Sequence, residues 1–137
     1  MTRPILLDTC AAIWLANNEA IGKAAEAELA AAEQEAGGIV VSPISAWEIG
    51  QLVSRGRLAL TMEPAAWFTT LLNSGIVLAP MPPEVLVASS FLPGVALRDP
   101  ADRILAATAR AFSFRLMTRD RPLLEFGAAG HLQAIAC

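Results

Sequence analysis

Short apolar runs alternate with amphipathic stretches along this chain. Runs of Ile, Leu and Val at Ile5–Leu7, Ile39–Val41 and residues 76–78 predict strands that are buried on both faces. Arg115–Thr118 predicts a fourth strand, and residues 132–136 are a weaker candidate for a last one. The pattern therefore indicates four to five short strands.

Helical patterns connect these strands. Proline opens several of them and glycine ends several, as the conformational preferences of these residues favour. We expect helices at residues 11–16, 21–35, 45–54, 64–73, from 82 toward 91 and from 100 to 112, with a short helical turn from 120. Alternation of strands and helices implies right-handed crossovers, so we predict an α/β fold with a mostly parallel sheet covered on both faces. The length predicts a single domain over residues 1–137.

The composition is apolar: 55% of the 137 residues are hydrophobic, 17% are charged, and the mean hydropathy is +0.50. These values exclude a disordered chain. The longest uncharged stretch, residues 64–83, holds four prolines, so we expect no membrane span. Asp8 interrupts the first apolar run before it reaches signal-peptide length. We expect a soluble, cytoplasmic protein whose surplus apolar surface is covered by a second copy or a bound partner.

Charge is distributed unevenly. Residues 1–97 carry four bases and nine acids, whereas residues 98–137 carry six arginines and four acids. The arginines form either a solvated face or a rim that binds anions, since the guanidinium group suits phosphate.

Carboxylates follow the predicted strands. Asp8 comes directly after the first strand, Glu48 lies in the helix after the second, and Asp120 comes two residues after the fourth. Asp99 and Asp102 lie in the first turn of the long helix. Each aspartate at such a place has an ordinary explanation as a helix N-cap. Because strand ends of a parallel sheet share one edge, however, the acids are also expected to meet in one cleft.

A gathering of carboxylates requires a cation or protonation. Two like charges ~4 Å apart repel by about 4 kcal/mol at an effective dielectric near 20. Oxygen ligands select Mg²⁺ or Mn²⁺, and the lone His131 and the distant Cys10 and Cys137 make no zinc site. One or two such ions at an acidic site are suited to hydrolysis of phosphodiester bonds.

Four segments together closely resemble the PIN-domain family and, more narrowly, its VapC-type toxins. They are residues 5–9 (ILLDT), 45–49 (SAWEI), 98–107 (RDPADRILAA) and 116–120 (LMTRD). The resemblance implies a three-layer α/β/α sandwich and a Mg²⁺- or Mn²⁺-dependent endoribonuclease that cuts tRNA or rRNA. It also implies a homodimer and inhibition by a VapB-type antitoxin.

Residue by residue, Asp8, Glu48, Asp102 and Asp120 match the four acids of the family, and Asp99 matches an additional one. Asp8 and Asp102 are expected as primary metal ligands. Glu48 is expected to complete the metal shell or position water, and Asp120 to act through water or on a second ion. Asp99 is expected as a further metal ligand. The supporting hydroxyls are Thr9 and Thr118, and the expected RNA contacts are Arg98, Arg119 and Arg121. Many relatives carry His at Leu97 or Arg98 and a bulky residue at Ala101, which bears on substrate choice.

Other readings remain. A phosphatase with Asp8 as nucleophile needs a second Asp where this chain has Cys10, and a lysine other than Lys23. A binding module without activity predicts lost acids, and a non-toxin nuclease or another metal-dependent phosphoester hydrolase needs the same acids.

The remaining candidates have simpler readings. We expect Cys10 to be a small buried hydrophobe and Ser45 a helix cap. Trp14, Trp47 and Trp67 are expected in the core or at an interface. The face that carries Arg103 and Arg110 fits RNA, an antitoxin or a second subunit equally well.

Overall fold

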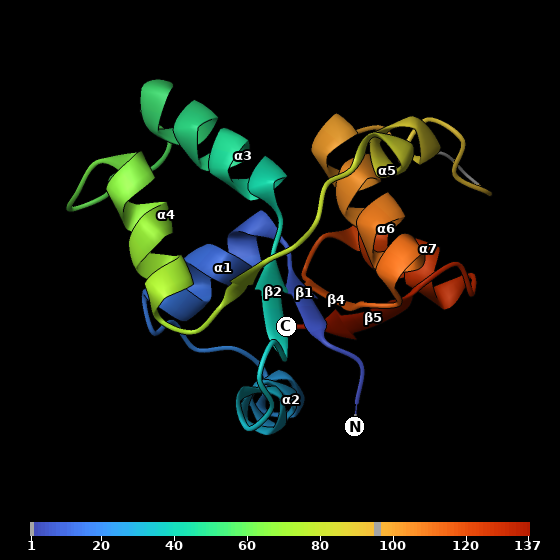
Figure 1. The fold of residues 1–137 in the computed structure, drawn as a ribbon, viewed down its shortest axis with the longest axis horizontal. Coiled ribbons are helices and arrows are strands. Elements are labelled where there is room, and N and C mark those ends of the chain that lie inside the picture. Colours follow the sequence, from blue (N-terminus) through green and yellow to red (C-terminus); the bar gives the residue numbers. More distant parts are fainter. Residues whose placement is uncertain (1, 95–96) are drawn as a thin grey trace.

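Five strands form one parallel sheet in the computed structural model, which describes residues 2–94 and 97–137 (Figure 1). In their order across the sheet they are β3 (Val77–Leu78), β2 (Ile39–Val41), β1 (Ile5–Leu7), β4 (Arg115–Thr118) and β5 (Gln133–Ala136). All four pairings are parallel. The predicted strands are confirmed, including the weaker candidate near the C-terminus. However, β3 is exposed rather than buried, because it lies at the edge of the sheet.

Helices connect the strands as the pattern predicts. They are α1 (Thr9–Ala16), α2 (Lys23–Glu33), α3 (Pro43–Ser54), α4 (Pro64–Asn73), α5 (Pro83–Ala88), α6 (Pro100–Phe112) and α7 (Arg121–Ala128). Helices α1 and α3 begin two residues earlier than expected, because Asp8 and Ser42 cap them. The prediction of Ser45 as a helix cap is therefore wrong, since Ser45 lies inside the first turn of α3.

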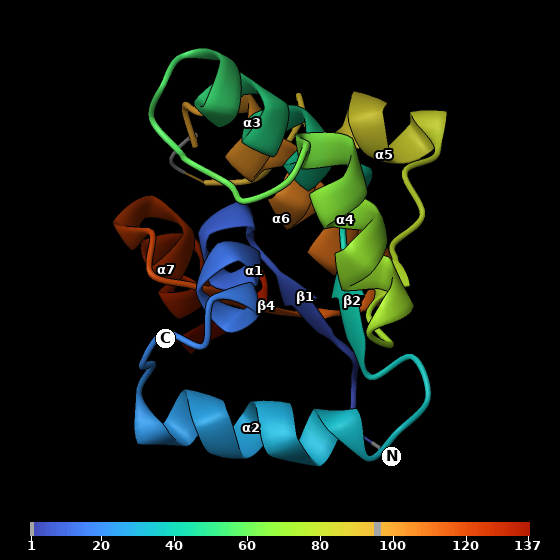
Figure 2. The same ribbon diagram turned by 90° about the vertical axis from the view of Figure 1, so that its left-hand side faces the viewer.

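Two apolar clusters cover the two faces of the sheet. Alternation along β1 directs Ile5 and Leu7 into the first cluster and Leu6 into the second. Helices α1, α2 and α4 contribute to the first cluster, and α6 and α7 to the second (Figures 1 and 2). This arrangement confirms the three-layer α/β/α sandwich. Within the described residues, no helix has the length and apolar character needed to cross a membrane.

The expectation for Cys10 is wrong, and the three tryptophans differ in their burial. Cys10 is exposed, because its neighbours Thr9 and Ala11 occupy the buried side of α1. Among the tryptophans, Trp67 lies in the core and Trp14 is half-buried, whereas 57% of Trp47 is exposed. Trp47 therefore remains a candidate for an interface only.

Candidate active site

The predicted acids meet at the carboxyl ends of β1 and β4. The chain runs outward from β1 through β2 to β3 on one side, and from β4 to β5 on the other. The boundary between β1 and β4 is thus the point where strand order reverses, which is where open α/β sheets form ligand sites. Asp8 follows β1, and Asp120 follows β4.

Both carboxylate oxygens of Asp8 are held in place. Oδ1 accepts a hydrogen bond from the backbone N–H of Ala11 at 2.7 Å, and Oδ2 accepts one from the Thr118 hydroxyl at 2.5 Å. Only 6% of Asp8 is exposed. Burial raises the pKa of Asp8, and the two hydrogen bonds oppose that rise. Asp8 is therefore an N-cap as well as a member of the acidic cluster.

Thr118 links Asp8 to Asp120. Its side chain is fully buried at the end of β4, and its oxygen accepts a hydrogen bond of 2.9 Å from the backbone N–H of Asp120. Asp120 in turn caps α7, accepting from the N–H of Leu123 at 3.3 Å. Two acids on adjacent segments are thereby held by one hydroxyl.

Glu48 reaches the cluster from α3. It is half-buried and hydrogen-bonded to the hydroxyl of Thr9, whose oxygen also lies 2.9 Å from Oγ of Ser45. Burial raises the pKa of Glu48, the bond to Thr9 lowers it, and the charges of Asp99 and Asp8 raise it further.

Asp102 is the acid most affected by its neighbours. The pKa of Asp102 is raised to about 8, and burial is the largest cause. The next causes are the charges of Asp120 and Asp99, a hydrogen bond shared with Asp120, and the charge of Glu48. Asp99 caps α6, accepting from the N–H of Ala101 at 3.3 Å. The structure thus brings all five predicted acids into one electrostatically coupled group.

The donor set fits a hard divalent cation by its chemistry, because carboxylate oxygens in mutual repulsion gain from added positive charge. In residues 2–94 and 97–137, no three acidic, histidine or cysteine side chains stand close enough to hold an ion together. Ligation of one ion by several of the acids therefore requires side-chain rotation. Glu48, Asp102 and Asp120 are only partly buried.

Five of the six arginines in residues 98–137 divide into two groups, and the sixth, Arg115, is buried and pairs with Glu28. Arg103 donates to the carbonyls of Ser89 and Leu97 at 3.0 and 2.5 Å, and Arg110 donates to the carbonyl of His131 at 2.5 Å. Their guanidinium groups thus bind the backbone of this chain, a role that the helix pattern did not indicate.

The second group comprises the predicted RNA contacts, Arg98, Arg119 and Arg121, which are exposed. Arg119 has intramolecular partners as well: its guanidinium lies 3.8 Å from the ring centre of Trp14 and donates to the carbonyl of Ala20 at 3.3 Å. It therefore attaches the connection between α1 and α2 to the end of β4.

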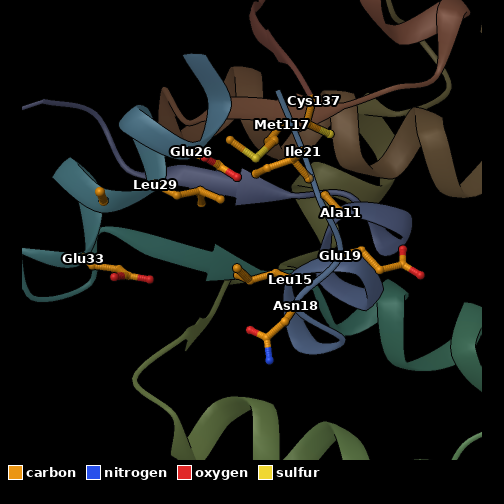
Figure 3. A pocket seen from close by; sticks show the side chains of 11 residues that line it. Ala11, Leu15, Asn18, Glu19, Ile21, Glu26, Leu29, Glu33, Met117 and Cys137 are labelled. Carbon is orange, nitrogen blue, oxygen red and sulfur yellow. The ribbon is translucent and has the colours of Figure 1, made fainter. Parts of the chain in front are cut away.

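A separate pocket of about 290 Å³ lies between α1 and α2 (Figure 3). Its walls include apolar side chains of Leu15, Ile21 and Leu29 together with three glutamates. The glutamates are Glu19, Glu26 and Glu33. Ala11, whose N–H binds Asp8, also lines it, so this pocket adjoins the acidic cluster without containing it.

Comparison with known proteins places this geometry in a family. A family model described as PIN domain matches residues 5–128. Ribonuclease VapC22 of Mycobacterium tuberculosis is 30% identical over 120 residues, which span 87% of this chain and 88% of that protein.

Solved structures share the fold. VapBC2 from Rickettsia felis, bound to a DNA fragment from its promoter, aligns with a TM-score of 0.68 and 17% identity over 96% of this chain and 97% of that one. DNA-bound VapBC from Salmonella typhimurium aligns with a TM-score of 0.64 and 14% identity over 98% of both chains. On the strength of the family model and the relative at 30% identity, this chain belongs to the PIN-domain family.

Proposed function

We propose that this chain is a VapC-type endoribonuclease, dependent on Mg²⁺ or Mn²⁺, and the toxin of a toxin–antitoxin pair. Family membership and the similarity to a protein named as a ribonuclease support the reaction class. The observation that carries the proposal is the meeting of acids from four segments at the edge between β1 and β4. A group of negative charges is costly without a cation, and a cluster of carboxylates is the arrangement that phosphodiester hydrolysis uses.

Each acid has a proposed role in metal binding or hydrolysis. One or two bound ions would offset the carboxylate charge, activate a water molecule and stabilise the leaving oxygen. Asp8 and Asp102 are the proposed primary ligands, and Glu48 completes the shell or orients the attacking water. Asp120 acts through water or at a second ion, and Asp99 is a further ligand to the metal. Thr118 and Thr9 hold Asp8 and Glu48 in place through their hydroxyls.

The test is cleavage of total cellular RNA by antitoxin-free protein, with Mg²⁺, Mn²⁺ or EDTA, and with Asp8→Asn in parallel. We expect discrete fragments of tRNA or rRNA that need the metal and are absent with the variant. Because the variant loses the Asp8 charge but keeps the side-chain shape, an unchanged unfolding temperature in EDTA would show that the fold is intact.

Other outcomes distinguish the alternatives. Wild-type cleavage by Asp8→Asn would show that the proposed centre is wrong. Metal-dependent hydrolysis of a phosphoester such as p-nitrophenyl phosphate without RNA cleavage would favour another phosphoester hydrolase. Metal binding with no hydrolysis at all would favour a binding role.

A VapB-type antitoxin is the proposed partner, since VapB is present with the structural neighbours. The pocket between α1 and α2 suits a basic, amphipathic antitoxin segment, because three glutamates surround apolar side chains. A segment bound there lies beside Asp8. We expect Glu26→Gln combined with Glu33→Gln to weaken capture of a co-expressed antitoxin while leaving RNA cleavage by the free toxin unchanged.

A homodimer is also proposed. Large apolar side chains are exposed at Trp47, Val87 and Phe91, to 57%, 63% and 80%, and exposed apolar surface of this kind is available to a second copy. Sedimentation of wild-type protein and of Phe91→Ser tests whether Phe91 helps to join two copies.

A further inference from the structure

Ser45 is a buried hydroxyl with no part in capping its helix. The cap of α3 is Ser42, whose Oγ accepts from the N–H of Ile44 at 3.1 Å. Ser45 is fully buried in the same turn, and its Oγ lies 2.9 Å from Oγ1 of Thr9, at the start of α1. A buried hydroxyl needs a hydrogen-bonding partner, and Thr9 supplies it from a distant part of the sequence.

Thr9 stands between Ser45 and Glu48. Residues three apart on a helix lie on one face, so Ser45 and Glu48 both reach the same threonine. An ionised carboxylate only accepts hydrogen bonds, and a threonine hydroxyl has a single proton. With Glu48 ionised, Thr9 therefore donates to Glu48, and Ser45 donates to Thr9.

We propose that Ser45 is a positioning residue, which fixes the carboxylate of Glu48 through the hydroxyl of Thr9. Glutamate has several rotatable bonds, and Glu48 is only half-buried on α3 next to the exposed Trp47. The two hydroxyls restrict its carboxylate to the side of the acidic cluster. Thr118 does the same for Asp8 from the other side of the cluster. This inference rests on the proposed nuclease function, in which Glu48 takes part.

The chain offers a matched control for the test. Ser42 and Ser45 are both fully buried serines at the start of α3, but only Ser45 contacts Thr9. Ser45→Ala should weaken binding of Mn²⁺, measured by calorimetry on the whole protein, and RNA cleavage by about 10- to 100-fold, as is usual for groups that orient ligands. Ser42→Ala should lower the unfolding temperature in EDTA while leaving Mn²⁺ affinity unchanged.

A double-variant cycle separates positioning from packing. Thr9→Val keeps the shape of the side chain and should reproduce the loss of Mn²⁺ affinity seen with Ser45→Ala. If the two residues form one chain to Glu48, the double variant loses no more than either single one. Losses that add, or wild-type Mn²⁺ affinity and cleavage with Ser45→Ala, would overturn the role of Ser45.

Failure of this inference is distinguishable from failure of the proposed function. If Asp8→Asn and Glu48→Gln abolish cleavage and Ser45→Ala has no effect, only the positioning role is wrong. If Asp8→Asn and Glu48→Gln retain full cleavage, the nuclease centre itself is wrong, and the positioning role is lost with it.

Discussion

Thr118 donates a hydrogen bond of 2.5 Å to Oδ2 of Asp8, from the end of one strand to the end of its neighbour. The register of the sheet makes this contact, because Leu7 pairs with Met117 and the next residues along each strand are Asp8 and Thr118. The same threonine oxygen accepts from the N–H of Asp120. Pairing of β1 with β4 thus determines how two of the acids are held.

Thr118→Val should reduce RNA cleavage by about 10- to 100-fold, because valine keeps the shape but releases Asp8 and Asp120. Thr108→Val is the matched control. Thr108 is equally buried on α6, but its hydroxyl donates only to the carbonyl of Ile104 at 2.7 Å. Steady-state cleavage rates of the two variants compare the positions directly, and equal rates would show that the bond between Thr118 and Asp8 has no part in activity.

Stability in the absence of metal should depend on Asp102. Burial and the neighbouring acids raise the pKa of Asp102 from an ordinary 3.8 to about 8 in the folded protein. The folded state therefore holds this proton more tightly than the unfolded state, so the contribution to stability is complete below pH 4 and is lost as the pH rises toward 8. We expect the unfolding temperature in EDTA to be higher for Asp102→Asn than for wild type at pH 8, with little difference at pH 4.

Added Mg²⁺ or Mn²⁺ provides the complementary measurement. Because a carboxylate binds a cation in its ionised form, a metal site that includes Asp102 predicts that either ion raises the unfolding temperature of the wild type more at pH 8 than at pH 5. Asp102→Asn should show a smaller rise. Parallel unfolding curves for both proteins across this pH range would contradict the coupling of Asp102 to its neighbours.

Gly38 should resist substitution for steric reasons. A Cβ at this position would lie 2.1 Å from the backbone oxygen of Ala32, at the turn that leads into β2. We expect Gly38→Ala to destabilise the protein by about 1–3 kcal/mol, as other overpacking changes do. Gly50→Ala, in α3, meets nothing within 4 Å and should stabilise it by about 0.5–1 kcal/mol. Urea unfolding of both variants measures the two changes.

Substitution of two arginines in residues 98–137, Arg121 and Arg103, should have different effects on RNA cleavage and on stability. Arg121→Ala should lower cleavage of RNA and weaken its dependence on salt concentration, with no change in unfolding temperature, because Arg121 is exposed near the acids. Arg103→Ala should lower the unfolding temperature, because Arg103 binds two backbone carbonyls. A loss of stability with Arg121→Ala, or an unchanged unfolding temperature with Arg103→Ala, would reverse these assignments.

The strands and the acids were accessible from local pattern alone. Ile5–Leu7, Ile39–Val41 and Arg115–Thr118 have their predicted bounds, because short runs that are apolar throughout, or apolar at their centre as at Leu116 and Met117, fit buried parallel strands. Asp8 was found because it directly follows such a run, and Asp120 because it comes two residues after one. Helix ends were harder: the caps Asp8 and Ser42 start α1 and α3 earlier than the apolar pattern suggests.

Contacts between residues that are distant in the sequence depended on the tertiary structure. Sheet order places β1 next to β4, and this contact between the two ends of the chain brings Thr118 to Asp8. The sequence by itself therefore determined which segments are strands and which acids follow them, because those properties depend on neighbours along the chain. Only the fold decided that Ser45 faces Thr9, that Cys10 is exposed and that Arg103 binds backbone, because these depend on how each helix is rotated against the sheet.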